Sequence, residues 1–112
     1  MQLEVKKLLY DVRESADLIA SFSKNRSFED YVTDRMLRSA IERQFEIMGE
    51  ALNRLAKIAP EVAAKIPDYR KIIGFRNVLI HGYDSVLDEV VWSILVEHLP
   101  NLAATVERLL AS

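Results

Sequence analysis

The chain has 112 residues, half of them apolar, a net charge of −2 and no cysteine. This length suits one domain with its own buried core, so we expect a single domain over residues 1–112. The apolar content excludes an intrinsically disordered chain. The lack of cysteine excludes disulfides, thiolate metal sites and a cysteine nucleophile.

The sequence contains no segment that is typical of a membrane or secreted protein. Residues 1–7 lack the apolar run of a signal peptide, and no apolar stretch approaches the roughly 20 residues that span a bilayer. We therefore expect a soluble cytoplasmic protein. Generic nucleic-acid binders are usually basic, yet residues 65–83 carry four cations and one anion, a local +3 against −5 on the remainder. This distribution favours a confined phosphate site.

Helical periodicity runs through the N-terminal half of the sequence. A first helix is expected over 2–22, and Ser27 is expected to cap a short helix over 28–32. The Thr33-Asp34 pair then opens a long central helix over 35–59, which Pro60 ends. Apolar residues recur every three or four positions on the first helix (Val5, Leu8, Val12, Ala16, Ile19, Phe22) and on the central helix (Leu37, Ile41, Phe45, Met48, Leu52, Leu55, Ala59).

The C-terminal half continues the helical pattern. Residues 61–65 form one or two turns at most, and Asp68 is expected to cap a helix over 69–81, with Gly82 as its left-handed end. The last helix begins near Asp88 and is either kinked at Pro100 or split there into two coaxial pieces. Its apolar stripe is Leu87, Val91, Leu95, Leu99, Leu102, Val106 and Leu109. We predict an all-α antiparallel bundle of four main helices with one or two short extra helices.

Two groups of titratable residues are interpreted as structural. His98 lies late in a helical segment, where a cation stabilises a helix C-terminus. Glu46 and Glu50 are one turn apart on the central helix, but no third ligand accompanies them, so a solvated or interior polar pair is favoured over a metal site. We expect no metal and no cofactor.

The candidate chemistry lies at the end of the 69–81 helix. His81 can exchange a proton near neutral pH, and Asn77, four residues earlier, can hydrogen-bond the imidazole and fix its orientation. Arg76 offers a planar fork for phosphate, and the phenol of Tyr83 can reach the same group. A base and a cation suffice for RNA cleavage by the 2′-hydroxyl. The structural alternative is that Arg76, Asn77 and His81 only cap carbonyls and form salt bridges with Asp84 or Asp88.

The segment Phe75-Arg76-Asn77-Val78-Leu79-Ile80-His81-Gly82-Tyr83 resembles the Arg-x4-His-x-Tyr signature of HepT-like toxins, which are HEPN-domain ribonucleases. The resemblance covers nearly the whole chain. Further matching segments are Ser27 to Tyr31 at the entry to the second helix, Phe45 to Ala51 in the central helix, and Val91-Trp92 and Leu99-Pro100 in the last helix.

The resemblance implies a HEPN-like fold and a metal-independent endoribonuclease of a type VII-like toxin–antitoxin pair. Arg76 and His81 would be catalytic, Asn77 would support them, and two chains would form a homodimer with a composite active site. The implied antitoxin is a minimal nucleotidyltransferase that uses ATP to transfer AMP to Tyr83. Such a modification would inhibit the enzyme, because an anionic nucleotide beside His81 would repel the RNA phosphate.

Further residues carry two interpretations each. Gly49 interrupts the central helix and indicates either close helix packing or an approach of the motif helix that lets Glu50 hydrogen-bond into the site. Phe45, Tyr69 and Trp92 fit the core or a dimer interface better than base stacking.

Two other functions remain open beside the toxin. The chain could be a non-catalytic helical subunit that binds nucleotide and partner for a minimal nucleotidyltransferase. It could also be a purely structural bundle, in which case Arg76, Asn77 and His81 would be buried and fully paired.

Overall fold

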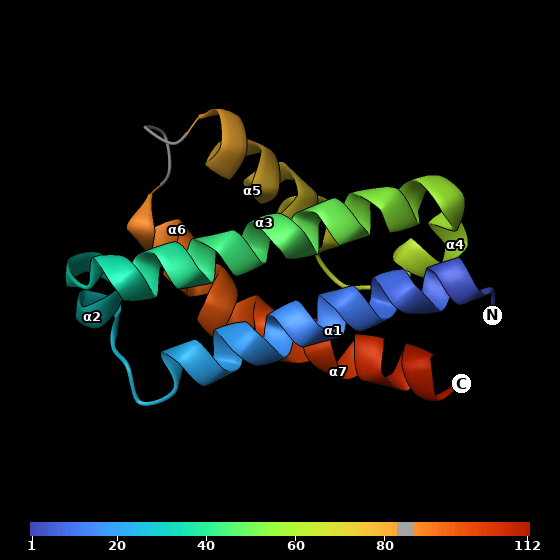
Figure 1. Cartoon of the computed structure of the whole chain (residues 1–112), viewed down its shortest axis with the longest axis horizontal. Coiled ribbons are helices and arrows are strands. Elements are labelled where there is room, and N and C mark those ends of the chain that lie inside the picture. The colour runs from blue at the N-terminus through green and yellow to red at the C-terminus, as the bar shows by residue number, and fades with distance from the viewer. Residues whose placement is uncertain (83–86) are drawn as a thin grey trace.

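The computed structural model describes residues 1–82 and 87–112 and confirms the all-α prediction (Figure 1). No strand occurs in these two ranges. The first four predicted helical ranges and the 69–81 range are all present, with small shifts at their ends. The helices are α1 (Leu3–Ser23), α2 (Phe28–Thr33), α3 (Arg35–Ile58), α4 (Pro60–Ala63), α5 (Tyr69–His81), α6 (Asp88–Ser93) and α7 (Leu99–Ala111), with a π-helical segment, η2 (Ile94–His98), between α6 and α7.

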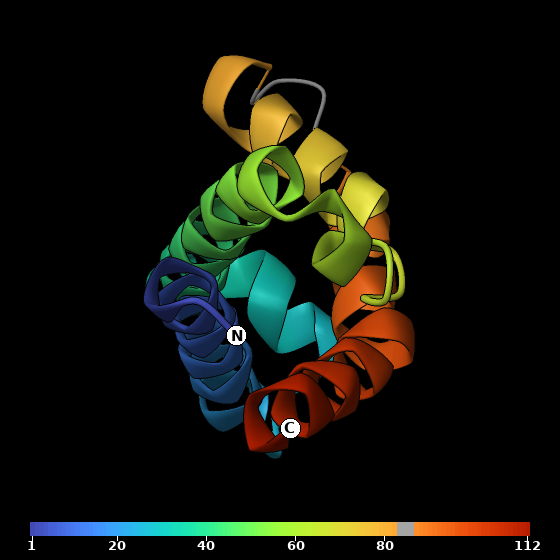
Figure 2. The same cartoon turned by 90° about the vertical axis from the view of Figure 1, so that its right-hand side faces the viewer.

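The core lies between α1, α3 and the α6–η2–α7 segment, with α1 antiparallel to α3 (Figures 1 and 2). The predicted stripe of α3 is buried in full, and that of α1 is buried except for the partly buried Phe22. In the stripe of the last helix, the prediction for Leu87 is wrong, because this residue precedes α6 and its side chain is 61% exposed. None of the described helices is long and apolar enough to cross a membrane.

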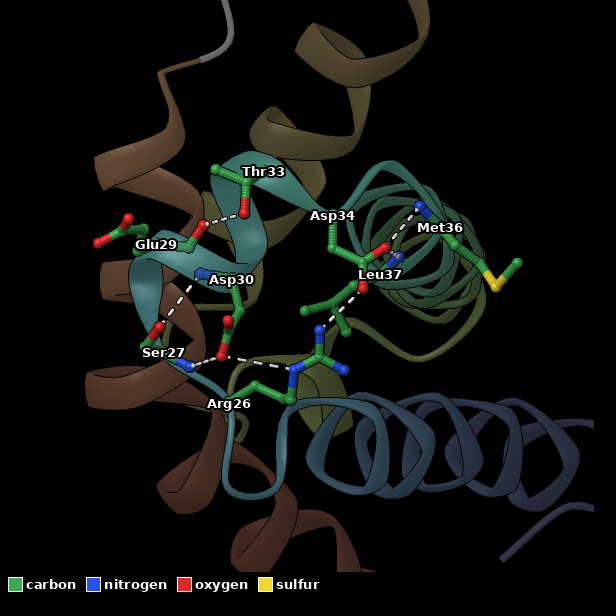
Figure 3. Close-up of polar contacts among 8 residues, drawn as sticks. All are labelled: Arg26, Ser27, Glu29, Asp30, Thr33, Asp34, Met36 and Leu37. Carbon is green, nitrogen blue, oxygen red and sulfur yellow. Dashed lines mark hydrogen bonds and ion pairs between the residues drawn. The ribbon is translucent and has the colours of Figure 1, made fainter.

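Side-chain caps fix the entries to α2 and α3, as predicted (Figure 3). Ser27 Oγ accepts a hydrogen bond from the Asp30 amide at 3.1 Å, and Asp30 Oδ2 accepts one from the Ser27 amide at 2.8 Å, which is a capping box. Asp34 Oδ1 accepts from two amides in the first turn of α3. Arg26 pairs with both carboxylates. The backbone hydrogen bond lowers the pKa of Asp30, and the Arg26 contact lowers that of Asp34.

Aromatic and ionic contacts attach α6 to the α2–α3 corner. The Trp92 ring lies 5.8 Å from the Tyr31 ring and 6.4 Å from the Phe28 ring, between centroids. Arg38 on α3 donates to both oxygens of Asp88 at the start of α6, at 2.5 and 2.7 Å. Trp92 therefore packs within the fold, which agrees with its predicted packing role.

The expected cap of α5 is wrong. Asp68 occupies the position before α5, but its φ of 62° is left-handed and its side chain makes no capping hydrogen bond. A side chain caps efficiently from the extended conformation, which Asp68 does not adopt. Its Oδ2 instead lies 2.7 Å from His98 Nδ1. His98, predicted to stabilise a helix end, lies at the end of η2 and joins it to the start of α5.

The last helix is irregular just before Pro100, near the predicted kink, but it is not split into two pieces. Proline has no amide hydrogen and its ring clashes with the carbonyl four residues back. The helix widens over η2, and the Leu99 amide donates to the Ile94 carbonyl, five residues back. The chain thus continues from α6 to α7 through a π-helical turn.

Helix α5 packs chiefly on α3 and lies on its outer side, away from α1 and α7 (Figure 2). Ile72 and Phe75 are buried in this contact. The Phe75 ring packs edge-on against the Phe45 ring, with 5.3 Å between the ring centroids. At Gly49 the helices are so close that an added Cβ would lie 2.3 Å from Arg76 Cβ and 3.3 Å from the Ile72 carbonyl oxygen. Gly49 therefore sets the distance between α3 and α5.

We expect Gly49→Ala to lower the free energy of unfolding by about 1 to 2 kcal/mol. Overpacking costs about 1 to 3 kcal/mol, and the upper part of this range, about 2 to 3 kcal/mol, applies because the clash is with a Cβ atom that cannot move without its helix. The better helix propensity of alanine offsets about 1 kcal/mol of this cost. Gly74 on α5 is the matched control, since a Cβ there would meet nothing within 4 Å. Gly74→Ala should raise stability by about 1 kcal/mol. Urea denaturation of both variants measures this, and a Gly49→Ala protein as stable as the wild type would contradict it.

Candidate active site

Arg76 projects from α5 toward α3 and is held along most of its length. Its Cβ and Cγ lie where a side chain on Gly49 would be, and only 22% of its side-chain surface is exposed. A long side chain packed in this way has few alternative rotamers open to it. The position of its guanidinium is therefore determined by the α3–α5 contact.

Two neighbours hold the guanidinium of Arg76. Its Nη2 donates to Glu50 Oε2 at 2.6 Å, and its Nη1 donates to Asn77 Oδ1 at 2.8 Å. Its Nε is buried and has no hydrogen-bond partner among the described residues. Since a buried unpaired donor is unfavourable, this geometry is maintained by the surrounding packing.

The Glu50 carboxylate is shared between two arginines. Its Oε2 accepts from Arg76, and its Oε1 accepts from Arg54 Nε at 3.0 Å, one turn further along α3. Two interpretations of Gly49 followed from the sequence, close helix packing and a hydrogen bond between Glu50 and the motif helix. The structure has both features, since α3 and α5 pack closely at Gly49 and Glu50 accepts a hydrogen bond from Arg76. Glu46, by contrast, pairs with Arg43 at 3.7 Å.

His81 is the last residue of α5, and its side chain is exposed. Gly82 follows, and its amide donates to the Val78 carbonyl at 2.8 Å. The predicted left-handed end is wrong, because Gly82 has a φ of −136°, which lies outside the left-handed region. Tyr83 and Asp84, both named as contacts of the motif, lie outside the described residues.

The expected hydrogen bond between Asn77 and His81 is not among those made by the described residues. Asn77 Oδ1 accepts from the neighbouring Arg76 instead. A charged guanidinium is a stronger donor than a neutral imidazole, which accounts for the choice. In one chain, therefore, Arg76 and Asn77 are hydrogen-bonded to each other, while His81 is exposed to solvent.

A groove of about 550 Å³ contains Arg76 and Glu50. Helices α1, α3 and α5 line it, and several of its charged residues were not singled out from the sequence. The lining residues are Glu4, Lys7, Leu8, Asp11, Arg43, Glu46, Ile47, Glu50, Ala51, Arg54, Arg76 and Ile80.

A signal for this groove was present on the central helix. Arg43, Glu46, Glu50 and Arg54 recur every three or four residues, so they share one face, as the core stripe does on another. A charged stripe is normally read as a solvated surface, and only the placement of α5 shows that it borders a groove.

A second groove of about 540 Å³ lies between α5 and the α6–η2 segment. It is lined mainly by apolar side chains and contains neither Arg76 nor His81. Within residues 1–82 and 87–112, no three histidine, aspartate or glutamate side chains gather closely enough to hold a metal ion.

Comparison with known proteins gives one family. The family model described as "Ribonuclease HepT-like" matches residues 12–109, which is most of the chain and includes α5. No solved structure matches the chain.

Individual relatives agree over nearly their full lengths. The protein named "Probable ribonuclease HepT" from Thermococcus cleftensis is 32% identical over 109 residues, which cover 97% of this chain and 98% of the relative. A protein of Methanocaldococcus jannaschii named "Putative RNase" is 33% identical over 104 residues, covering 93% and 94% of the two chains. One of Caldanaerobacter subterraneus, with the same kind of name, is 33% identical over 102 residues, covering 91% and 90%.

Proposed function

The chain belongs to the HepT-like ribonuclease family, which makes it an RNA-cleaving hydrolase, and we propose that Arg76 and His81 are its catalytic residues. The reaction is an attack of the RNA 2′-hydroxyl on the adjacent phosphodiester, without a metal ion or a cofactor. The observation that carries this proposal is the arrangement at the end of α5. There a fixed arginine and a solvent-exposed histidine lie five residues apart on one helix.

His81 acts as the general base and general acid. Its neutral imidazole takes the proton from the 2′-hydroxyl, and the 2′ oxygen forms a bond to phosphorus. The bond from phosphorus to the 5′ oxygen then breaks, and a protonated imidazole returns a proton to that oxygen. The products are a 2′,3′-cyclic phosphate and a 5′-hydroxyl end. Exposure of His81 at a helix end supports this role, because substrate can reach it.

Arg76 stabilises the negative charge that develops on the phosphorus oxygens in the transition state. Its guanidinium is held in place by the α3–α5 contact and by Glu50, and each terminal nitrogen keeps a second N–H that a phosphate oxygen can accept from. Asn77 and Glu50 are supporting residues in this proposal, since both hydrogen-bond the guanidinium directly.

The active site is proposed to be composite, formed by two copies of the chain in a homodimer. Within one chain Arg76 points toward α3, while His81 is open to solvent. In the proposed dimer, each active site combines Arg76 of one chain with His81 of the other. Val78 and Ile80, on α5 between the two catalytic residues, are 38% and 39% exposed. Apolar side chains left open beside a motif are what a dimer contact would cover.

We also propose that the enzyme is the cytoplasmic toxin of a toxin–antitoxin pair. Its antitoxin is a minimal nucleotidyltransferase that transfers AMP from ATP to Tyr83. The transfer forms a bond between the phenol oxygen and the α-phosphorus, and pyrophosphate leaves. The added phosphodiester places negative charge two residues from His81, where an RNA phosphate would be repelled.

One observation favours a second candidate, a non-catalytic subunit that binds the nucleotidyltransferase. Glu50 and Asn77 already occupy the guanidinium of Arg76, which is what a purely structural arginine would show. His81 does not fit this candidate, because it is exposed and makes no described hydrogen bond.

We expect His81→Ala to lower the rate of RNA cleavage by about 10² to 10⁴-fold, and Arg76→Ala by about 10² to 10³-fold, with EDTA present throughout. Cleavage is measured on a fluorescent RNA, and the cyclic phosphate end is identified by mass spectrometry. Lys71→Ala is the control, since it removes an exposed cation from α5 on the side of the other groove and should leave the rate unchanged. Helicity by circular dichroism checks folding. Undiminished cleavage by folded His81→Ala would overturn its role.

Coexpression with the proposed nucleotidyltransferase antitoxin should add the mass of one or more AMP groups to the chain. Peptide mapping should place the first of them on Tyr83, and RNA cleavage should fall. Tyr83→Phe, which lacks only the phenol oxygen, is the control and should stay unmodified there and active. An unmodified Tyr83 in the wild-type chain would refute AMP transfer.

A further inference from the structure

The triad of Arg54, Glu50 and Arg76, which we call the shared-carboxylate triad, lies in the groove between α1, α3 and α5. Each oxygen of Glu50 accepts from one arginine, at 3.0 Å from Arg54 Nε and at 2.6 Å from Arg76 Nη2. The carboxylate therefore holds two guanidiniums side by side, one from α3 and one from α5.

The charge of this triad differs from that of the other ion pairs along the groove. Lys7 with Asp11, at 2.8 Å, and Arg43 with Glu46, at 3.7 Å, each join one cation to one anion. Glu4 adds a further carboxylate to the lining, so the four cations and four anions of the groove sum to zero. Within this lining the triad joins two cations to one anion and keeps a net charge of +1. A partly enclosed surface with a local positive charge attracts anions to that point.

The two arginines of the triad differ in what they can offer to a ligand. Arg76 is 22% exposed and uses both terminal nitrogens for Glu50 and Asn77. Arg54 is 68% exposed, and the hydrogen bond described for it uses Nε. A guanidinium has five N–H donors, so beyond the Nε contact this exposed side chain keeps the donors of its two terminal nitrogens, whose fork suits two phosphate oxygens.

We propose that Arg54 is a second phosphate-binding residue of the RNA site, and that it holds a backbone phosphate next to the one that Arg76 contacts. This inference rests on the proposed ribonuclease function and extends its site from α5 to α3. Arg54 binds substrate and takes no part in the chemical step. Glu50 is the positioning residue between the two arginines, because it fixes both guanidiniums through its two oxygens.

The probe is a fluorescein-labelled 2′-O-methyl RNA oligonucleotide, which has no 2′-hydroxyl and so reports binding without cleavage. Fluorescence anisotropy gives its dissociation constant over a range of KCl concentrations. We expect Arg54→Gln to weaken binding about 10-fold and to lower the slope of log K against log salt by about 0.7, as loss of one single-strand phosphate contact should. Arg54→Lys should retain most of the slope, because it retains the charge.

Lys57→Gln is the matched control. Lys57 is an exposed cation one turn beyond Arg54 on α3 and does not line the groove. This variant should bind within about two-fold of the wild type with an unchanged slope, since most surface charges contribute little. A cleavage assay should show a raised KM and a nearly unchanged kcat for Arg54→Gln.

The possible outcomes separate this inference from the proposed function. If the wild type binds and cleaves, but Arg54→Gln keeps the wild-type affinity and slope, Arg54 does not bind phosphate and the inference fails alone. If Arg54→Gln lowers kcat with no change in slope, its role is to hold Glu50, and the inference also fails. If the wild type does not bind the oligonucleotide, the ribonuclease site itself is wrong.

Discussion

The close approach of α5 to α3 at Gly49 is the constraint on which the candidate site depends. Any side chain at this position would overlap Arg76 Cβ, so the absence of one lets the stem of Arg76 lie directly on the backbone of α3. The following residue, Glu50, then reaches the guanidinium at 2.6 Å. One glycine thus determines both the distance between two helices and the position of the Arg76 guanidinium.

The same constraint explains why the charges of the site are distributed over two helices. Helix α5 packs chiefly on α3, so the residues opposite Arg76 come from the charged stripe of α3. Arg54 and Arg76 meet at Glu50, although they are far apart in the sequence. His81 is the last residue of α5 and its side chain is exposed, which is what the proposed roles in substrate binding and in a two-chain site require.

Much of the fold followed from local rules. The 3.6-residue spacing identified the helices, and the caps at Ser27 and Asp34 placed two helix starts, because these contacts form within four residues of each other. Asp68 failed as a cap because its backbone is left-handed, and its carboxylate contacts His98, which is thirty positions away and outside the reach of local rules. Leu87 failed because the helix begins one residue after it.

The candidate site was also predictable only where its features are local in the sequence. The spacing of Arg76 and His81 could be read along the 69–81 helix. The sequence also showed that Gly49 interrupts the central helix, but it left two interpretations of that glycine open. The bond from Asn77 to Arg76 and the shared carboxylate of Glu50 depend on which side chains α3 and α5 place together, and sequence spacing does not contain that information. Within α6–η2–α7, a proline signalled a break, but the π-helical turn that accommodates it depends on packing on both sides.

Coexpression of the Arg76→Ala and His81→Ala chains under separate affinity tags tests the composite site most directly. After both tags are used in turn, every purified dimer holds one chain of each kind. One of its two sites would then have an intact Arg76 and an intact His81 if these residues come from different chains. We expect this mixed dimer to recover roughly half of the wild-type cleavage rate, while each variant alone is inactive. A mixed dimer as inactive as its parents would contradict a site shared between two chains.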